Sequence, residues 1–186
     1  LKAYDLPSKE FFELTTEKGH KLNAWMIKPK NFDASKKYPV LMFQYSGPGS
    51  QEVANAWLDI NDMWYMMLSQ QGYIVACVDG RGTGFKGADF KKSTYLQLGK
   101  LQVEDQIASA KELSKLPYIN AKEIGIWGWS YGGFMASNCM LKGNDVFKVG
   151  IAVAPVKAGV FMIACTQNVF YELHKKTLLV TTIIRR

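Results

Sequence analysis

The sequence predicts an α/β fold with a doubly wound, mostly parallel sheet. Short apolar runs alternate along the chain with amphipathic segments, and the connections between them are short. The run at residues 73–79 is apolar up to its last residue, as expected of a strand buried on both faces of a parallel sheet. Residues 124–129 form another apolar run, and a helix-like segment follows it after a single serine. Alternation of this kind favours right-handed crossovers within one sheet.

Each expected element has its own local signal. Strands are assigned to short apolar or β-branched runs, helices to periodic stretches without Gly or Pro, and breaks to Gly, Pro, Asn and Asp. The expected elements, in chain order, are a hairpin of strands at 11–16 and 22–27 around a polar turn at 17–21, a strand at 38–45, a helix at 60–71 capped by Gly72, a strand at 73–79, a helix at 101–116, a strand at 124–129, a helix at 131–141 and a strand at 147–154.

Composition excludes several classes of function. The 186 residues suffice for one domain with a hydrophobic core. The formal charge of +7 at pH 7 comes from scattered lysines, which predicts a solvated basic surface and no nucleic-acid interface. The apolar tract at 149–165 contains Pro155 and Lys157 and is short for a membrane span, so it is expected to be a core strand and its exit. Residues 1–5 do not resemble a signal peptide.

Neither the cysteines nor the glycine-rich loop predicts a cofactor. The chain has three cysteines, Cys77, Cys139 and Cys165, without the spacing of metal ligands. Cys77 falls in a strand and Cys139 in a helix, so both are expected to be buried thiols. The glycines at 80–84 lack the G-x-x-x-x-G-K-S/T pattern of a phosphate-binding loop. We therefore expect no metal and no other cofactor.

A G-x-S-x-G motif at residues 128–132 supplies the candidate chemistry. In a sharp turn from strand to helix, the serine takes a strained backbone conformation, and side chains in place of Gly128 and Gly132 would collide. The helix after Ser130 points its free N–H groups and positive dipole end to where an oxyanion would develop. The alternative is a Gly-rich turn in an α/β protein without chemistry.

Several segments together resemble the catalytic domain of the prolyl oligopeptidase family, and most closely its dipeptidyl peptidase IV branch. The segments are 36–39 (KKYP), 45–51 (YSGPGSQ), 78–83 (VDGRGT), 103–106 (VEDQ), 128–133 (GWSYGG) and 150–156 (GIAVAPV). This resemblance implies an α/β-hydrolase fold. It also implies a serine exopeptidase that removes N-terminal dipeptides with proline or alanine in the penultimate position.

The resemblance also implies roles for individual residues. Ser130 matches the nucleophile that forms an acyl-enzyme, and the Tyr131 backbone N–H and the Tyr45 hydroxyl match the two oxyanion donors. The Tyr131 ring and Val156 match positions that line the apolar proline pocket. For Tyr45 the alternative is a strand-end aromatic residue half in the core.

Three further residues are given structural roles. Asp79 and Arg81 are expected to form an ion pair that fixes a loop, and Trp129 is expected to pack in the interior.

A general base and an acid are missing from the positions where this fold places them, which is after the nucleophile in the order Ser, Asp or Glu, His. Asp145 comes one strand too early, and Glu172 and His174 have no strand and helix between them. His20 lies in the hairpin turn. None of the four is expected to act in a triad, so the chain alone is expected to have little or no activity.

Residues 157–186 are expected to be a divergent tail read out of frame. After Ala-Pro-Val the family continues with a segment resembling Trp-Arg-Phe-Tyr-Asp-Ser-Val-Tyr-Thr-Glu-Arg, and suitable synonymous codons for residues 158–168 spell this segment when read from the third base. A one-base deletion near codon 157 would produce such a tail, whose uncharged, β-prone run at 177–184 is an aggregation liability. The chain then divides into a partial α/β-hydrolase peptidase domain at 1–156 and this tail.

The parent protein is expected to carry a second domain ahead of the hydrolase domain. The resemblance suggests a β-propeller, which would hold the free amine of the peptide substrate with acidic residues. It further suggests a homodimer of the full-length protein, and export or a periplasmic location if the source is bacterial. Two alternatives stay open: another α/β-hydrolase, such as an esterase or acylaminoacyl peptidase, and a non-catalytic protein that keeps the fold.

Overall fold

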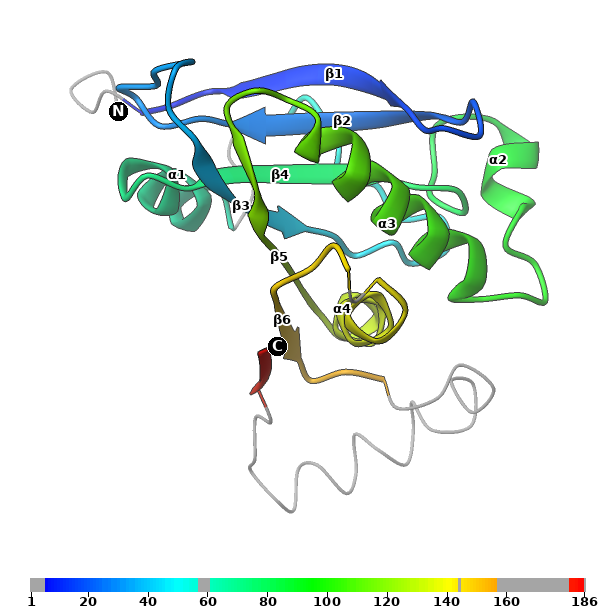
Figure 1. Cartoon of the computed structure of the whole chain (residues 1–186). Helices are drawn as coiled ribbons and strands as arrows, with labels where there is room; N and C mark the ends of the chain where they lie inside the picture. Colours follow the sequence, from blue (N-terminus) through cyan, green and yellow to red (C-terminus); the bar gives the residue numbers. More distant parts are fainter. Residues whose placement is uncertain (1–5, 57–60, 144, 157–180, 186) are drawn as a thin grey trace.

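The computed structural model describes residues 6–56, 61–143, 145–156 and 181–185 (Figure 1). The strands are β1 (Lys9–Thr15), β2 (Lys21–Ile27), β3 (Tyr38–Phe43), β4 (Ile74–Asp79), β5 (Ile119–Trp129), β6 (Val149–Val153) and β7 (Thr181–Arg185). The helices are α1 (Asp62–Gln70), α2 (Ala88–Lys92), α3 (Lys100–Ser114) and α4 (Tyr131–Lys142).

The strands form one sheet in the order β1-β2-β4-β3-β5-β6-β7 (Figure 1). Strands β4, β3, β5 and β6 are parallel neighbours, whereas β1, β2 and β7 pair antiparallel at the two edges. The chain moves from β3 to β4 in one direction and then passes back across β3 to reach β5. This reversal creates a switch point at the carboxyl ends of the strands, which is where open α/β sheets bind their ligands.

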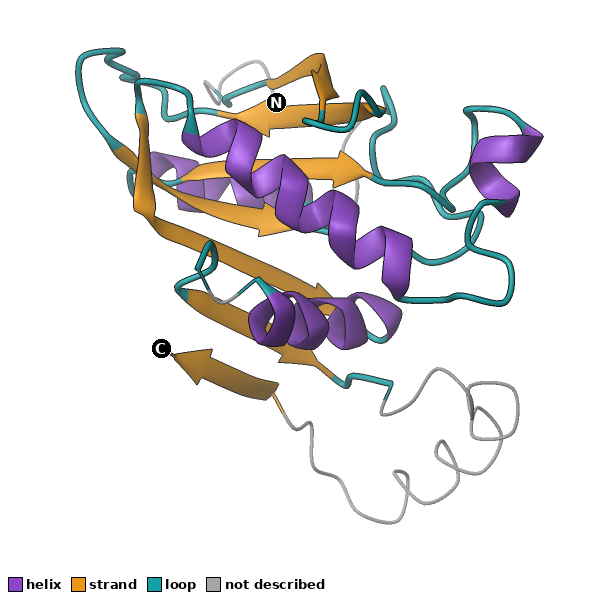
Figure 2. Ribbon diagram, turned by 45° about the vertical axis from the view of Figure 1, so that its right-hand side comes forward, coloured by secondary structure: helices purple, strands orange, loops and turns teal. Residues whose placement is uncertain are grey.

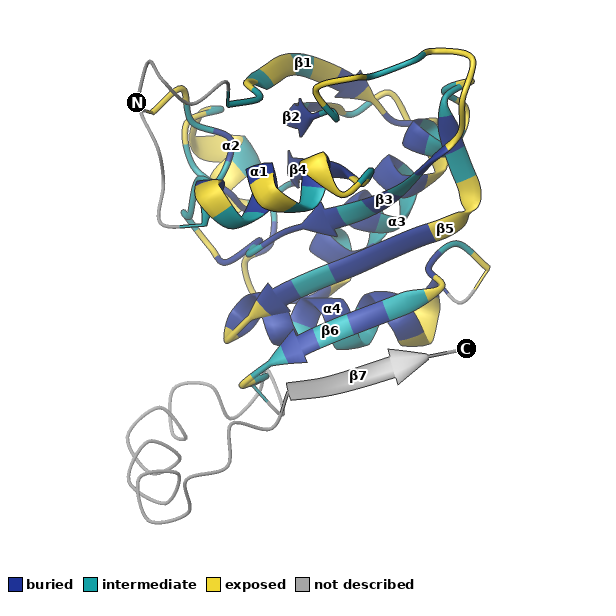
Figure 3. Cartoon of the chain, turned by 90° about the vertical axis from the view of Figure 1, so that its left-hand side faces the viewer, coloured by how far each residue is buried: buried dark blue, intermediate teal, exposed yellow. Residues whose placement is uncertain are grey.

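Helices cover both faces of the sheet (Figures 2 and 3). Helices α3 and α4 lie together on one face, and α1 lies on the other, against β2 and β4. Side chains of β4 alternate accordingly: Ala76 and Val78 join the cluster under α3 and α4, while Val75 and Cys77 join the cluster with Tyr65 of α1. Right-handed crossovers in opposite directions put the helices on opposite faces.

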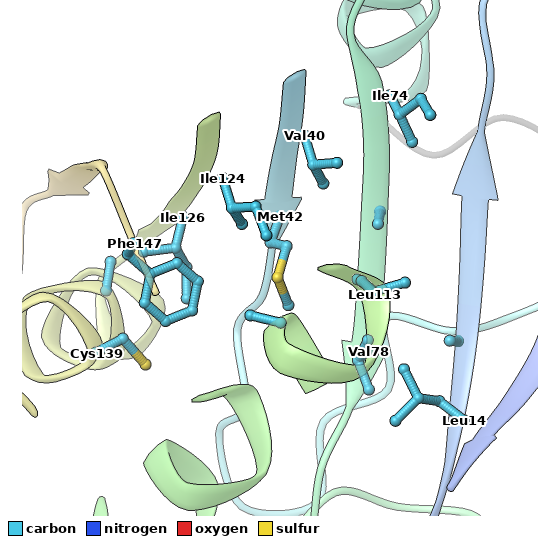
Figure 4. Close-up of a cluster of buried hydrophobic side chains, with 14 of the residues drawn as sticks. Leu14, Val40, Met42, Ile74, Val78, Leu113, Ile124, Ile126, Cys139 and Phe147 are labelled. Atoms are coloured by element: carbon cyan, nitrogen blue, oxygen red, sulfur yellow. The ribbon is translucent and has the colours of Figure 1, made fainter. Parts of the chain in front are cut away.

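The larger core lies between the sheet and the α3–α4 layer. Figure 4 shows Met42 and Ile126 of neighbouring strands close to Phe147 and to Cys139 of α4, and all four side chains are buried. Burial of one such aliphatic or aromatic side chain contributes about 1.5–3 kcal/mol. This cluster therefore holds β5 and α4 in place, and the turn between them carries the candidate nucleophile.

The expected order of elements is confirmed: most ends shift by one or two residues, whereas β5 begins five residues earlier than expected. Helix α1 ends at Gln70 with Gln71 as its C-cap, one residue earlier than expected, and Gly72 follows the cap with φ of 91°. Helix α2 was not expected, because it has five residues and none of them is buried, which leaves no apolar periodicity to detect.

Three expectations concern the cysteines, the apolar tract and the tail. Cys77 and Cys139 are buried as expected, whereas Cys165 lies outside the described residues. The start of the apolar tract forms β6, as expected of a core strand. The end of the β-prone run in the tail pairs with β6 as β7. No helix within the described ranges is long and apolar enough to cross a membrane.

Candidate active site

Ser130 lies alone between β5, which ends at Trp129, and α4, which begins at Tyr131. Its φ of 55° and ψ of −116° fall in a region that residues with a side chain rarely occupy. The Ser130 N–H donates to the carbonyl of Val153 at 2.8 Å, and this bond ties the turn to the end of β6. Ser130 is exposed to solvent. The strained turn therefore displays the hydroxyl at the carboxyl edge of the sheet.

The two motif glycines allow β3 to approach this turn closely. A Cβ placed on Gly128 or on Gly132 would lie 2.5 Å from the backbone oxygen of Gln44. The Gln44 side chain also donates from Nε2 to the carbonyl of Gly132 at 2.7 Å, in a buried position. The expected reason for the glycines is confirmed, because any side chain here would push the β3 loop away from the Ser130 turn.

Tyr45 lies just beyond the end of β3, at the same edge of the sheet as Ser130. Strands β3 and β5 are parallel neighbours, and the ladder continues past β3 because the Gln44 N–H donates to the Trp127 carbonyl at 3.2 Å. Tyr45 is half-buried, and its ring centroid lies 6.2 Å from that of Tyr131. The structure thus brings together the three residues to which the family resemblance gives catalytic roles.

Tyr131 combines a buried ring with a backbone N–H at the start of α4. The first N–H groups of a helix have no partner within the helix, so they are available to an anion. The Tyr131 hydroxyl accepts a hydrogen bond from Gln102 Nε2 at 2.9 Å, and burial raises the pKa of this phenol to about 12. Val156 is half-buried, and its N–H donates to the carbonyl of Ser130 at 3.3 Å. Both candidate pocket residues therefore flank the serine.

The prediction that Asp79 and Arg81 form an ion pair with each other is wrong. Arg81 binds Asp105 of α3 instead: its Nε lies 3.1 and 3.0 Å from the two carboxylate oxygens, and a terminal guanidinium nitrogen lies 2.7 Å from Oδ1. Asp79 accepts from the backbone N–H groups of Glu52 and Val53, at 3.0 and 2.8 Å for its Oδ2. Both residues do fix loops, as expected, but through separate contacts that the local sequence could not pair.

Asp79 makes the stability of the domain depend on pH. Burial raises the pKa of its carboxyl to about 6, despite the two N–H donors that lower it. In the unfolded chain the pKa of such a group is about 3.9, so folding favours the protonated form, and the stability that this group contributes is lost as pH rises through about 6.

We expect the free energy of unfolding of the wild type, relative to that of Asp79→Asn, to fall by about 2 kcal/mol between pH 4 and pH 7. Urea unfolding of both proteins across this range measures it. A difference that stays flat or grows with pH would contradict the assignment.

The expectation that Trp129 packs in the interior is wrong. Trp129 is 62% exposed, because it occupies an outward position at the last residue of β5. Its neighbour Trp127, two residues earlier on the same face, packs against Phe43 and Trp64 in the aromatic cluster under α1. On β5 the cluster thus ends at Trp127, three residues before Ser130.

The candidates for an acid and a base lie away from Ser130 wherever the structure describes them. Asp145 follows the C-terminal end of α4 and pairs with Lys111 of α3 at 3.4 Å, whereas Ser130 precedes the N-terminal end of this 12-residue helix, about 18 Å away. His20 lies in the β1–β2 turn, and three strand spacings, about 14 Å, separate β2 from β5. Glu172 and His174 lie outside the described residues.

A doubly wound sheet with a strained serine turn between a central strand and the helix after it defines an α/β-hydrolase domain. A sequence model of the prolyl oligopeptidase family matches residues 41–177, and the chain belongs to this family of serine peptidases. The resemblance drawn from the sequence motifs is thereby confirmed.

Similar proteins carry dipeptidyl peptidase names. A probable dipeptidyl peptidase 4 of Aspergillus flavus is 40% identical over 179 residues, and dipeptidyl peptidase 4 of Trichophyton equinum is 43% identical over 157 residues. These matches cover 96% and 84% of this chain but only 23% and 20% of the relatives. The crystal structure of Porphyromonas gingivalis dipeptidyl peptidase 4 superimposes with a TM-score of 0.80 and 52% identity, covering 83% of this chain and 22% of that one.

Proposed function

We propose that this chain carries the nucleophile of a serine exopeptidase that removes dipeptides from peptide N-termini after proline or alanine. The observation that carries the proposal is the exposed Ser130 in its strained turn, with Tyr45 and Tyr131 at the same edge of the sheet. The similarity to proteins named dipeptidyl peptidase 4 supports the choice of this activity within the family.

In the proposed mechanism, the Ser130 Oγ attacks the scissile carbonyl carbon while a base takes its proton. The carbonyl oxygen becomes an oxyanion, which accepts hydrogen bonds from the Tyr131 backbone N–H and the Tyr45 hydroxyl. One donor of this kind is worth about 3–4 kcal/mol of transition-state stabilisation. Collapse of the intermediate breaks the C–N bond, the base returns the proton to the leaving amine, and water then hydrolyses the acyl-enzyme on Ser130.

Proline specificity is assigned to the Tyr131 ring and Val156. The ring is 3% exposed and packs between Tyr45 and Phe134, with centroid distances of 6.2 and 5.5 Å. Val156 lies beside the serine through its bond to the Ser130 carbonyl. A small apolar wall of this kind suits a pyrrolidine ring or a methyl group, since neither carries a polar atom that would lose its hydrogen bonds on burial.

We further propose that residues 1–156 are part of a hydrolase domain and that residues 157–186 are an out-of-frame tail. The complete peptidase is then the in-frame product that continues past residue 156 with the acid and the base of the triad, together with a propeller domain that binds the substrate amine. The nucleotide sequence tests whether the tail is out of frame. If the codons for residues 158–168 do not spell the family segment when read from the third base, this part of the proposal is wrong.

Tyr45→Phe in the complete peptidase should lower kcat by about 100- to 1,000-fold with little change in KM, because the lost hydroxyl binds the oxyanion and not the ground-state carbonyl. Steady-state kinetics on a dipeptidyl-proline chromogenic substrate measures the effect. Tyr95→Phe is the matched control, since Tyr95 is 77% exposed on the loop between α2 and α3 and should behave as wild type. If both variants lost kcat equally, the assignment of Tyr45 as an oxyanion donor would be wrong.

The activity itself is tested by comparing two proteins with that same substrate. The complete peptidase should release the chromophore, whereas the 186-residue chain alone should not exceed background. Serine-reagent-sensitive turnover by the chain alone would contradict the proposed absence of a base. Hydrolysis of short acyl esters by the complete protein without a preference for proline would favour an esterase or acylaminoacyl peptidase instead.

A further inference from the structure

Helix α3 buries polar side chains on the face that it turns to the sheet. Gln102, Asp105 and Gln106 are each at most 1% exposed, and their spacing of three and four residues places them on one side of the helix. Burying an amide or a carboxylate is unfavourable unless hydrogen bonds replace those to water. Each of the three makes such bonds, and at least one bond of each reaches Tyr131 or the loops that follow β3 and β4. Figure 2 shows α3 lying across the sheet beside α4.

Gln106 reaches the residue next to Tyr45. Its Nε2 donates to the backbone oxygen of Val78 at 2.8 Å and to Ser46 Oγ at 3.3 Å. Ser46 is buried and has φ of 58°, a conformation that a serine keeps only when its surroundings hold it there. One amide group thus links the end of β4 to the strained residue that follows Tyr45.

Asp105 fixes the loop that follows β4, which in turn contacts the loop that carries Tyr45. It accepts from the Arg81 side chain and from the Arg81 backbone N–H at 2.7 Å, which fixes the loop after β4. That loop forms two backbone hydrogen bonds with the loop of Tyr45: the Gly49 N–H donates to Gly82, and the Gly84 N–H donates to Ser50, both at 2.8 Å. The position of the Tyr45 loop therefore depends on the ion pair at α3.

Gln102 acts on the second aromatic residue of the site. Its Nε2 donates to the Tyr131 hydroxyl at 2.9 Å, and its Oε1 accepts from the Gly99 N–H at 2.8 Å just before α3 begins. Both the oxygen and the nitrogen of the Gln102 side-chain amide are thereby hydrogen-bonded. The hydrogen bond to the Tyr131 hydroxyl anchors this residue, the first of α4, to α3.

We propose that Gln102, Asp105 and Gln106 of α3 are positioning residues that hold Tyr45 and Tyr131 at the Ser130 turn. The inference rests on the proposed function for its kinetic consequence, but its structural consequence can be measured without any activity. Both consequences separate these residues from Ser109, which lies on the same helix, is equally buried, and has a hydroxyl with no hydrogen-bond partner among the described residues.

The first test is amide hydrogen exchange in the 186-residue chain. Gln106→Met and Asp105→Asn should each speed exchange of the Gly49 and Gly84 amides by about tenfold or more, because the loops lose their anchor, while amides of the β1–β2 hairpin stay as protected as in wild type. Ser109→Ala should leave the Gly49 and Gly84 amides unchanged. Two variants are used in case one does not fold, and unchanged Gly49 and Gly84 amides in a folded variant overturn the proposal.

The second test is a double-mutant cycle in the complete peptidase. Gln106→Met should lower kcat by about 10- to 100-fold with KM nearly unchanged, and it should add little in a Tyr45→Phe background, because its effect passes through the Tyr45 hydroxyl. Losses that multiply in the double variant, or an equal loss in Ser109→Ala, would overturn the proposal. If the wild type cleaves acyl esters and not the dipeptidyl substrate, the proposed function fails, and the same cycle is read on the ester.

Discussion

Ser130→Ala in the complete peptidase is expected to lower kcat by about a millionfold, to the residual catalysis that substrate binding and the oxyanion donors still provide. The reason is chemical: without the hydroxyl no acyl-enzyme can form, and the remaining oxyanion donors stabilise only an attack by water. The substitution changes an exposed residue, so the fold should persist. Turnover of a dipeptidyl-proline substrate, followed with enough enzyme to detect single turnovers, measures the loss.

Ser137→Ala is the matched control for this prediction. Ser137 lies on α4, seven positions after Ser130, and its hydroxyl donates to the carbonyl of Gly133 at 3.0 Å within the same helix. We expect this variant to keep wild-type kcat. If Ser130→Ala retained more than a thousandth of the activity, far above the roughly one-millionth that binding and an oxyanion hole alone would leave, the nucleophile would be another residue.

Gly132→Ala is expected to destabilise the domain by about 3 kcal/mol, near the upper end for overpacking a core. The added methyl group would lie 2.5 Å from the Gln44 oxygen and 3.2 Å from the Tyr45 Cα, and neither backbone atom can move without shifting the end of β3. The loop that carries Tyr45 would be displaced as well, so activity should fall further than stability alone explains. Urea unfolding of the 186-residue chain measures the first effect.

Gly19→Ala separates crowding from backbone strain. Gly19 has φ of 79° in the β1–β2 turn, and a Cβ there would meet no atom within 4 Å. We expect this variant to lose about 1 kcal/mol, from the left-handed conformation alone. If Gly132→Ala lowered the free energy of unfolding by no more than Gly19→Ala does, the close approach of β3 to the serine turn would not be the reason for a glycine at position 132.

Much of the fold could be predicted because its signals are local. The strand at 73–79 is apolar at nearly every position, and β4 is buried along its whole length. The glycines of the serine motif predict a crowded turn, and the backbone oxygen of Gln44 provides the crowding. Helix α2 escaped prediction because its residues are exposed and carry no periodic pattern.

The candidate site could be predicted only where a residue lies within or beside a recognisable motif. Ser130, Tyr45 and Tyr131 each stand at the end of a predictable element, so parallel neighbouring strands bring them to one edge. The partner of Arg81 is 24 positions away on α3, and no local pattern could choose Asp105 over Asp79. The buried polar residues of α3 left one signal in the sequence: their spacing of three and four residues is that of one helix face.

The most direct measurement is to map the adduct of a fluorophosphonate probe on the complete peptidase by mass spectrometry. Such a probe reacts with serines that a base activates and that oxyanion donors flank. We predict one adduct on the peptide that contains Ser130, formed in proportion to the loss of dipeptidyl-proline hydrolysis and absent from Ser130→Ala. An active protein whose adduct lies on a different serine, or whose Ser130 stays unlabelled, would contradict the assignment of the nucleophile.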